Sequence, residues 1–201
     1  MKIKLQSDES GRRSVFLTPQ VDVYVNVKYI RPMSAVPQSA DAEVSSTGMS
    51  SPDPDYQAKV RDSFDRQAAM TLVGATMTHL EPGLCEVSLP YRADLTQQHG
   101  FIHGGIVGMI ADSACGYAGF SMMPPGASVL TVEYKINMLS PGMGEKLIAR
   151  GKVLKAGKSL VITQCEVFAV QNGEHKLAAV MQQTLMVMHG RSDHAQAPNA
   201  R

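Results

Sequence analysis

Residues 97–120 (QQHGFIHGGIVGMIADSACGYAGF) hold the groups best suited to chemistry in this chain of 201 residues. His103 and two glycines end a polar run, and Asp112 and Ser113 are the polar residues of the apolar segment that follows. A buried, ionised carboxylate is costly unless it is hydrogen-bonded, and enzymes often keep such an acid as a general base or a nucleophile. Asp112 is therefore a candidate catalytic residue; the alternative is a structural Asp bonded to the backbone or to a nearby Ser.

Residues 104–120 predict a helix that is buried on all sides, because apolar or small side chains occupy nearly every position. Each glycine in this segment weakens the helix by about 1 kcal/mol relative to Ala, so their number indicates a close backbone approach to a neighbouring element. The helix would begin at Gly104, where unpaired N–H groups and the helix dipole favour negative charge. The Gly104 N–H is therefore a candidate donor to a developing anion.

The spacing of these two groups predicts an obligate dimer. Eight residues of helix place Gly104 and Asp112 about 12 Å apart along the axis. A reacting carbon must lie roughly 3 Å from both groups, so one helix cannot bring its own N-terminus and its own Asp to the same atom. Two antiparallel helices related by a twofold axis would bring the N-terminus of one chain to the Asp of the other.

The rest of the core must supply the elements that hold this helix. An amphipathic helix is expected in 56–73, where Val60, Phe64 and Ala68 recur one turn apart. Strands are expected on both sides of the turn at 81–83 and in 128–139, 146–155, 159–170 and 175–188, with Asn172-Gly173 as a tight hairpin turn.

The strand expected in 128–139 alternates without a break. Leu130, Tyr134 and Met138 would share one face, and Thr131 would lie on the polar face. Because antiparallel strands need only short turns, a long helix followed by a meander predicts an α+β fold. The fold class is thus a long central helix wrapped by a curved antiparallel sheet of five to six strands.

Composition divides the chain into three parts. Residues 1–54 predict an N-terminal extension that is largely disordered or linker, because 34–55 is rich in Ser, Pro, Ala and Asp. An alternating stretch in 21–30 leaves open an extra edge strand in place of a dispensable extension over 1–48. Residues 55–188 form the predicted domain, and 189–201 predict a disordered polar tail.

Several classes of function are disfavoured by composition. The net charge of +1 and the lack of a basic run argue against nucleic acid, and no apolar stretch is long enough for a membrane span. The N-terminus lacks the features of a secretory signal, and the three cysteines show no ligand spacing, which predicts reduced, buried thiols and a cytoplasmic protein. The histidines make no metal pattern, so no metal and no cofactor are predicted.

The segment HGFIHGGIVGMIAD resembles the PaaI-like (phenylacetate-pathway) group of hotdog-fold acyl-CoA thioesterases, in which HGG is followed by an Asp nine residues after the His. LEPGLCEVSLP is similar to the first hairpin of that family, VEYKINMLSPG to a strand ending in a Pro turn, and KAGKS to its basic turn. The resemblance covers roughly residues 60–188. It implies the hotdog fold, hydrolysis of an acyl-CoA to free acid and CoA, and a homodimer or a dimer of dimers.

The resemblance also implies roles at matching positions. Gly104 would polarise the thioester carbonyl through its N–H, and Asp112 of the facing subunit would attack directly or activate water. His103 would order the loop, Gln97 would lie near the thioester, and Thr131 would hold the Asp or the water.

A turn is implied as the binding site for the CoA phosphates, formed by Lys155, Gly157 and Lys158. A solvated hairpin tip is the alternative for these residues.

Other readings stay open on the sequence. A hotdog hydratase or dehydratase would place its Asp and His differently, and an acyl-CoA-binding module would not need an acid in an apolar helix. Cys115 and Ser113 lack the surroundings of a nucleophile. The acyl group, dimer against tetramer, and a nucleophilic against a general-base role of Asp112 are not decided by the sequence.

Overall fold

A computed structural model describes residues 4–7, 13–17, 21–24, 47–191 and 193–194, and the chain divides into two compact units at residues 38 and 39. In the first unit, β1 (Lys4–Ser7), β2 (Arg13–Leu17) and β3 (Val21–Tyr24) form an antiparallel sheet. The strand expected in 21–30 thus coincides with β3 over its first four residues, and its remainder lies outside the described residues.

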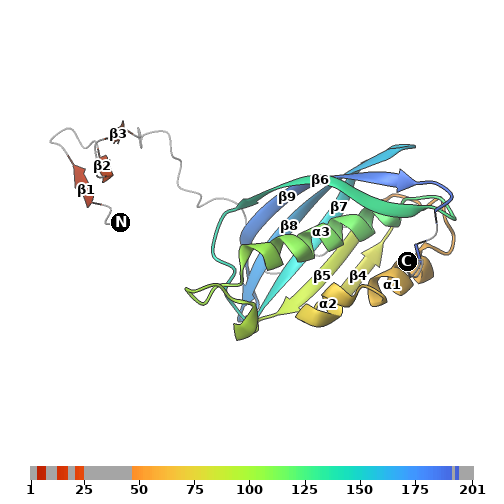
Figure 1. The fold of residues 1–201 in the computed structure, drawn as a ribbon, viewed down its shortest axis with the longest axis horizontal. Helices are drawn as coiled ribbons and strands as arrows, with labels where there is room; N and C mark the ends of the chain where they lie inside the picture. Colours follow the sequence, from red (N-terminus) through yellow and green to blue (C-terminus); the bar gives the residue numbers. More distant parts are fainter. Residues whose placement is uncertain (1–3, 8–12, 18–20, 25–46, 192, 195–201) are drawn as a thin grey trace, which may run out of the picture. The chain divides into compact units, whose positions relative to one another are not determined.

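The second unit is the predicted α+β domain (Figure 1). Its antiparallel sheet has six strands in the order β4-β5-β7-β8-β9-β6. The strands are β4 (Thr76–Glu81), β5 (Leu84–Pro90), β6 (Ser128–Met138), β7 (Lys146–Ala156), β8 (Leu160–Gln171) and β9 (Glu174–Met188). Every strand expected in this part of the chain is present. The hairpin between β8 and β9 turns at Asn172 and Gly173, both at positive φ, as a tight hairpin turn requires.

The helix α3 (Gly104–Phe120) lies against the sheet and confirms the predicted central helix. Ile110, Ala114 and Ala118 on this helix are fully buried. Gly151 on β7 shows how close the two layers lie, because a Cβ at this position would overlap the carbonyl group of Ala114. On the helix side, a Cβ at Gly119 would overlap the Leu185 side chain. These close contacts fix the position of α3 on the sheet.

The single helix expected in 56–73 is wrong, because the segment forms α1 (Tyr56–Asp65) and α2 (Ala68–Val73). Gln67 between them has an extended ψ of 91° and starts α2 at a new angle. With this break Met70 and Val73 are buried while Ala68 is exposed. Burying the larger side chains is the more favourable arrangement.

The uninterrupted alternation expected along β6 is also wrong. The pairing with β9 shifts register between Thr131 and Glu133, so Val132 is the extra residue of a β-bulge. Thr131 pairs with Leu185 and Tyr134 with Gln183, and both partners are buried on the side of the helix. The bulge therefore brings Thr131 to the same face as Tyr134.

Residues 47–55 contact the core of the second unit. Thr47 Oγ1 donates to the Pro82 carbonyl at 2.5 Å, and Ser51 Oγ to the Ser121 carbonyl at 2.6 Å. Asp53, 4% exposed, forms an ion pair with Lys59 at 2.7 Å. The domain boundary near residue 54 stays a prediction, and these contacts favour a start nearer to residue 47.

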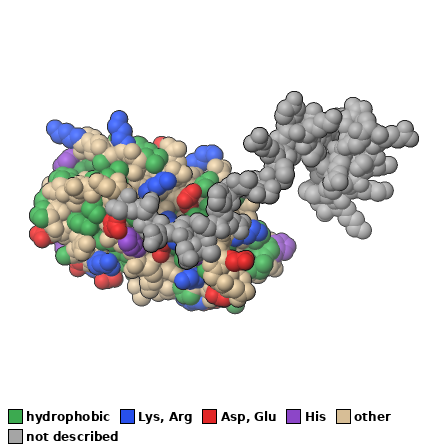
Figure 2. All heavy atoms as spheres, turned by 180° about the vertical axis from the view of Figure 1, so that it is seen from behind, with side chains coloured by type: hydrophobic (Ala, Val, Ile, Leu, Met, Phe, Trp, Pro, Cys, Tyr) green, Lys and Arg blue, Asp and Glu red, His purple; other side chains and the backbone are tan. Residues whose placement is uncertain are grey.

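The surface of the second unit carries charges of both signs. On the face seen in Figure 2, basic and acidic side chains are interspersed with hydrophobic ones. No helix among the described residues is long and apolar enough to cross a membrane.

Candidate active site

Asp112 lies in the middle of α3 on the side that faces β6, and it is half-buried. Its Oδ1 accepts a hydrogen bond from Thr131 Oγ1 at 2.9 Å and a second, short one from Gln183 Nε2. The predicted pair of Asp112 and Thr131 is thus in contact, and the contact depends on the bulge in β6. No hydrogen bond to Asp112 Oδ2 is found among the described residues.

Gln183 and Thr163 complete this polar cluster, and both are buried. Gln183 Nε2 also donates to Thr131 Oγ1 at 2.9 Å, and Thr163 Oγ1 lies 3.4 Å from Gln183 Oε1. The two residues come from β9 and β8, so three strands and α3 meet around one carboxylate. This arrangement fixes one oxygen of the carboxylate in place.

A groove opens beside Asp112, with a volume of about 380 Å³. Two hydrogen-bonded pairs form its polar walls: Ser113 Oγ donates to Gln67 Oε1 at 3.2 Å, and Ser63 Oγ lies 3.4 Å from Tyr117 Oη. Its lining residues are Ser63, Arg66, Gln67, Asp112, Ser113, Gly116, Tyr117, Val129, Leu130, Thr131 and Asp193. The carboxylate therefore faces a space that a small molecule could enter.

His103 and Gly104 form the start of α3, and both are exposed. His103 caps the helix: its Nδ1 accepts from the Gly105 N–H at 2.9 Å, and its carbonyl accepts from Ile106 and Val107. Of the four N–H groups in the first turn, only that of Gly104 has no acceptor among the described residues. The predicted donor is therefore available at the surface of this chain.

Gln97 lies in the loop before α3 and is half-buried. Its N–H donates to the Phe101 carbonyl at 2.8 Å, and its Oε1 accepts a short hydrogen bond from the His99 N–H. Among the described residues, no hydrogen bond joins Gln97 to Asp112 or Thr131. The structure therefore gives Gln97 a role in shaping the loop and does not bring it into this cluster.

The residues of the predicted CoA-binding turn lie at the end of β7 and in the link to β8, and all are exposed. The Gly157 N–H donates to the Leu160 carbonyl at 2.9 Å, and a Cβ at Gly157 would lie 2.6 Å from that oxygen. His189 Nε2 donates to the Lys158 carbonyl at 2.9 Å. The turn is a tight one with exposed lysines, and no hydrogen bond among the described residues connects it to Asp112.

The cysteines offer no nucleophile. Cys85, Cys115 and Cys165 are free and fully buried, as predicted from their scattered positions. Burial raises the pKa of the Cys85 and Cys165 thiols well above its usual range, so both stay protonated.

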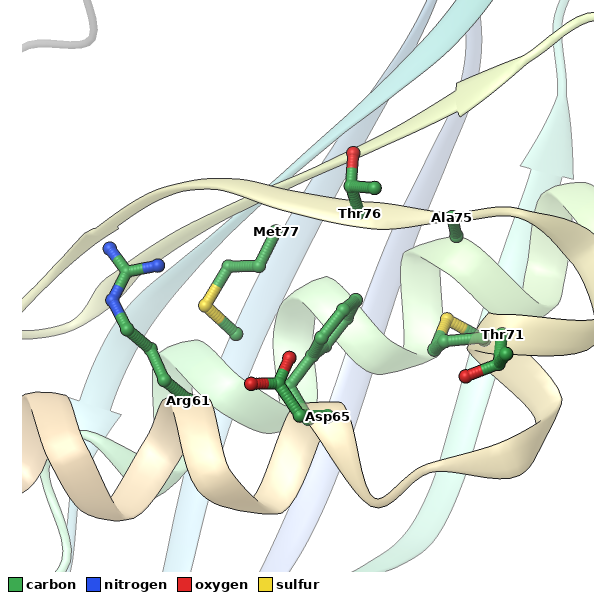
Figure 3. A pocket seen from close by; sticks show the side chains of 8 residues that line it. Arg61, Asp65, Thr71, Ala75, Thr76 and Met77 are labelled. Atoms are coloured by element: carbon green, nitrogen blue, oxygen red, sulfur yellow. The ribbon is translucent and has the colours of Figure 1, made fainter.

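A smaller cavity of about 260 Å³ lies between α1, α2 and β4 (Figure 3). Arg61 and Asp65 stand at its α1 side and Met77 on β4, and none of the predicted site residues lines it. No cluster of metal-binding side chains is found in the part of the chain that the structure describes.

Sequence reasoning missed Gln183 and Thr163, although a signal for both was present. Met181, Gln183 and Leu185 alternate on the inner face of β9, and Val161, Thr163 and Cys165 do the same on β8. A polar residue at an inward position of an apolar alternation needs a buried partner. Asp112 is the partner that the helix supplies.

Comparison with known proteins gives the family and the fold of this chain. The family model of the thioesterase superfamily matches residues 99–175. A candidate esterase of Saccharolobus solfataricus is 33% identical over 88 residues, which cover 44% of this chain and 62% of that relative's length. The fold also matches the PaaI protein of the Escherichia coli phenylacetic acid degradation operon, with a TM-score of 0.61 at 22% identity, over 68% of this chain and 95% of that one.

A nearer solved structure is that of a thioesterase family protein from Silicibacter pomeroyi. It is 48% identical, with a TM-score of 0.66, and the match covers 67% of this chain and 99% of that one. The identity holds over the whole of the relative. This chain therefore belongs to the thioesterase family and has its hotdog fold.

Proposed function

We propose that the chain hydrolyses an acyl-CoA thioester to the free acid and CoA, at a site shared by two subunits. The observation that carries this proposal is the state of Asp112: Oδ1 is held by two donors, and the carboxylate faces an open groove. A carboxylate with a purely structural role would not need to line an open groove. The family supports thioester hydrolysis in general, and the polar cluster supports Asp112 as the acting group.

Asp112 can act in either of two ways. As a general base, it takes a proton from water as the water oxygen attacks the thioester carbon; the C–S bond then breaks, and the sulfur receives that proton. As a nucleophile, Oδ2 attacks the carbon and displaces the CoA thiolate, and water then hydrolyses the mixed anhydride. Both routes place negative charge on the carbonyl oxygen, where a preorganised N–H donor is most effective.

The donor in this proposal is the N–H of Gly104 of the partner subunit. Because α3 is one unbroken helix, its own Gly104 lies about 12 Å from Asp112 along the axis. His103 would hold the loop that presents this N–H, and Gln97 would shape the approach to it. The exposed turn with Lys155, Gly157 and Lys158 would meet the phosphates of CoA.

The edge strand β6 supports the shared site. Among the described residues it is the last strand of the sheet, and large apolar side chains are exposed on both of its faces: Leu130, Val132, Tyr134 and Met138 are each about half exposed. A long apolar edge strand is a surface that a second copy of the chain can cover. Because Thr131 on this strand contacts Asp112, a partner on β6 would lie next to the carboxylate. A homodimer or a dimer of dimers is proposed on this ground.

The acyl group would lie in the groove beyond Asp112. Gly116, one helical turn after the acid, keeps this space open, since a Cβ there would meet no atom within 4 Å. A mid-helix glycine costs about 1 kcal/mol relative to Ala, and no close packing requires it at this position. The open part of the groove next to Gly116 is therefore suited to hold the acyl group of the substrate.

The test is Asp112→Asn, assayed on short, medium, long and aryl acyl-CoAs. We expect kcat to fall about 10²- to 10⁴-fold with unchanged folding, because Asn can neither accept the proton nor attack. Asp65→Asn, an exposed acid on α1 that does not line the groove, is the matched control and should keep full activity. If the wild-type protein hydrolyses none of these substrates but binds them, the chain is an acyl-CoA-binding module and the proposal is wrong.

A further inference from the structure

Gln183 is a buried amide at an inward position of β9, between Met181 and Leu185, and only 1% of it is exposed. An amide in such a place is costly unless its donors and its acceptor are all bonded. An apolar side chain of similar size would continue the alternation of the strand at no such cost. The amide therefore has to be explained by the groups it contacts.

The contacts of Gln183 define where each proton lies. Thr163 Oγ1 is 3.4 Å from Oε1, which leaves Nε2 to point at Asp112 Oδ1 and at Thr131 Oγ1, 2.9 Å away. Thr131 gives its own hydrogen to Asp112, so it accepts from Gln183. With both donors on Oδ1, the carboxylate cannot rotate without breaking two hydrogen bonds.

We propose that Gln183 is a positioning residue that determines which oxygen of Asp112 reacts. It holds Oδ1, and so it turns Oδ2 toward the groove, where no hydrogen bond to it is found among the described residues. The inference rests on the proposed function, and it holds for either role of Asp112, because a base and a nucleophile both need one free, oriented oxygen. Gln183 is not part of the groove lining, and among the described residues its hydrogen bonds to that lining are those to Asp112 and Thr131.

The first test is Gln183→Leu, which removes both N–H donors and keeps a side chain of similar size. We expect kcat to fall about 10- to 100-fold, since a small misplacement of a reacting group has effects of this order. KM should stay within about twofold, because Gln183 does not contact the substrate. The matched control is Gln182→Leu: the neighbouring residue is also a glutamine on β9, but it is exposed. Its kcat should equal that of the wild type.

The second test separates positioning from a purely structural role. In the Asp112→Asn background, Gln183→Leu should cause no further loss of kcat, because the group that it orients is already inactive. A structural defect would lower kcat by the same factor in both backgrounds. Gln183→Met, with a flexible side chain of similar length, repeats both measurements where the Leu variant fails to fold.

The outcomes are distinct. Wild-type protein without turnover on any acyl-CoA overturns the proposed function and this inference with it. Active wild type with a kcat of Gln183→Leu within twofold of Gln182→Leu, or equal losses in both backgrounds, overturns the inference and leaves the proposed function standing. Loss of the fold in both the Leu and the Met variants would show that the amide serves the fold, and would also overturn it.

Discussion

At the scale of single residues, substitutions at Gly104 can distinguish the effect of losing its backbone N–H from the effect of changing its side chain. Among the described residues, its N–H is the one in the first helical turn that has no acceptor. Proline lacks an N–H and is well accepted at this first helical position. His103 before it already has φ −59° and ψ 136°, the conformation that a residue before proline prefers.

Gly104→Pro should therefore remove the proposed oxyanion donor and leave α3 in place. We expect kcat to fall about 10²- to 10³-fold, the range seen when an oxyanion donor is lost. Gly104→Ala keeps the N–H, and its Cβ would lie 3.4 Å from Met138 Cε, an ordinary contact. The Ala variant should stay within a few-fold of wild type in steady-state assays with equal melting temperatures. Equal activity of the Pro and Ala variants would rule out the N–H as the donor.

The same scale shows what sequence could predict of the site. The roles of Asp112 and Gly104 could be predicted because both residues belong to one helix. The rise of that helix gives their spacing without any knowledge of the sheet. Gln183 was not, because its contact with Asp112 joins residues 71 positions apart and depends on strand order. The apolar alternation of β9 shows that Gln183 is a polar residue at an inward position, but it does not show which group the side chain contacts.

At the scale of the elements, the bulge in β6 is what the sequence could not show. Residues 130–138 alternate between apolar and polar side chains, and no glycine or proline marks Val132. The extra residue arises from pairing with β9, a property of two strands together. The strand itself was predicted correctly. The assignment of its side chains to the two faces was wrong, although Thr131 still contacts Asp112. The break between α1 and α2 has the same origin, because burial of Met70 and Val73 decides it.

The ion pair between Asp53, just before α1, and Lys59 on that helix contributes to stability in a way that depends on pH. Burial of Asp53 acts to raise its pKa, but the hydrogen bond and charge of Lys59 and the Asp55 N–H outweigh it, so the pKa lies below the usual value of 3.8. A lowered pKa in the folded state means that the ionised form stabilises the fold. This contribution is fully present above the usual value and is lost as the pH falls through the lowered one.

Asp53→Asn should therefore destabilise the domain by about 1–3 kcal/mol at pH 7, the range for a buried, charged hydrogen bond. The difference from wild type should shrink as the pH falls below 4 and through the lowered pKa of Asp53, since the carboxyl is then progressively protonated in the wild type as well. Urea unfolding at a series of pH values measures both effects. Asp55→Asn, an exposed acid two residues away, is the control and should unfold like the wild type at every pH. A difference that does not change with pH would contradict the ion pair as its cause.

At the scale of the whole molecule, the proposed site needs two chains, and this can be tested with two inactive variants. One subunit carries Asp112→Asn and the other Gly104→Pro. In a mixed dimer, the intact Asp112 of one chain faces the intact Gly104 of the other, so one of the two sites is complete. Random mixing gives half of the dimers in mixed form, so about one quarter of wild-type activity should return.

Co-expression of the two variants with different tags allows the mixed dimer to be purified, and its activity per dimer should be about half that of the wild type, because one of its two sites is complete. Each variant alone, carried through the same purification, is the control. A site built within one chain would give no recovery at all, and an active monomer in light scattering would contradict the shared site directly.

The topology of the domain followed from its sequence to a large extent, since each strand is local and the connections after α3 are short. The hairpin at Asn172-Gly173 and the strands β7 to β9 were predictable for this reason. The crossing that places β6 beyond β9 is a long-range choice that no local pattern contains. That choice creates the exposed edge on which the proposed dimer depends.

The close contact of Gly151 and Gly119 with their neighbours has a consequence for altering this protein by directed evolution. A larger residue at Gly151 would meet the backbone of α3 and push the helix off the sheet, which would carry Asp112 away from Thr131 and Gln183; at Gly119 it would displace the Leu185 side chain. Gly116, which lines the groove beside Asp112, has free space instead. A library meant to change substrate preference should therefore randomise Gly116 and hold Gly119 and Gly151 fixed, because free space is found at Gly116 and close contacts at the other two positions.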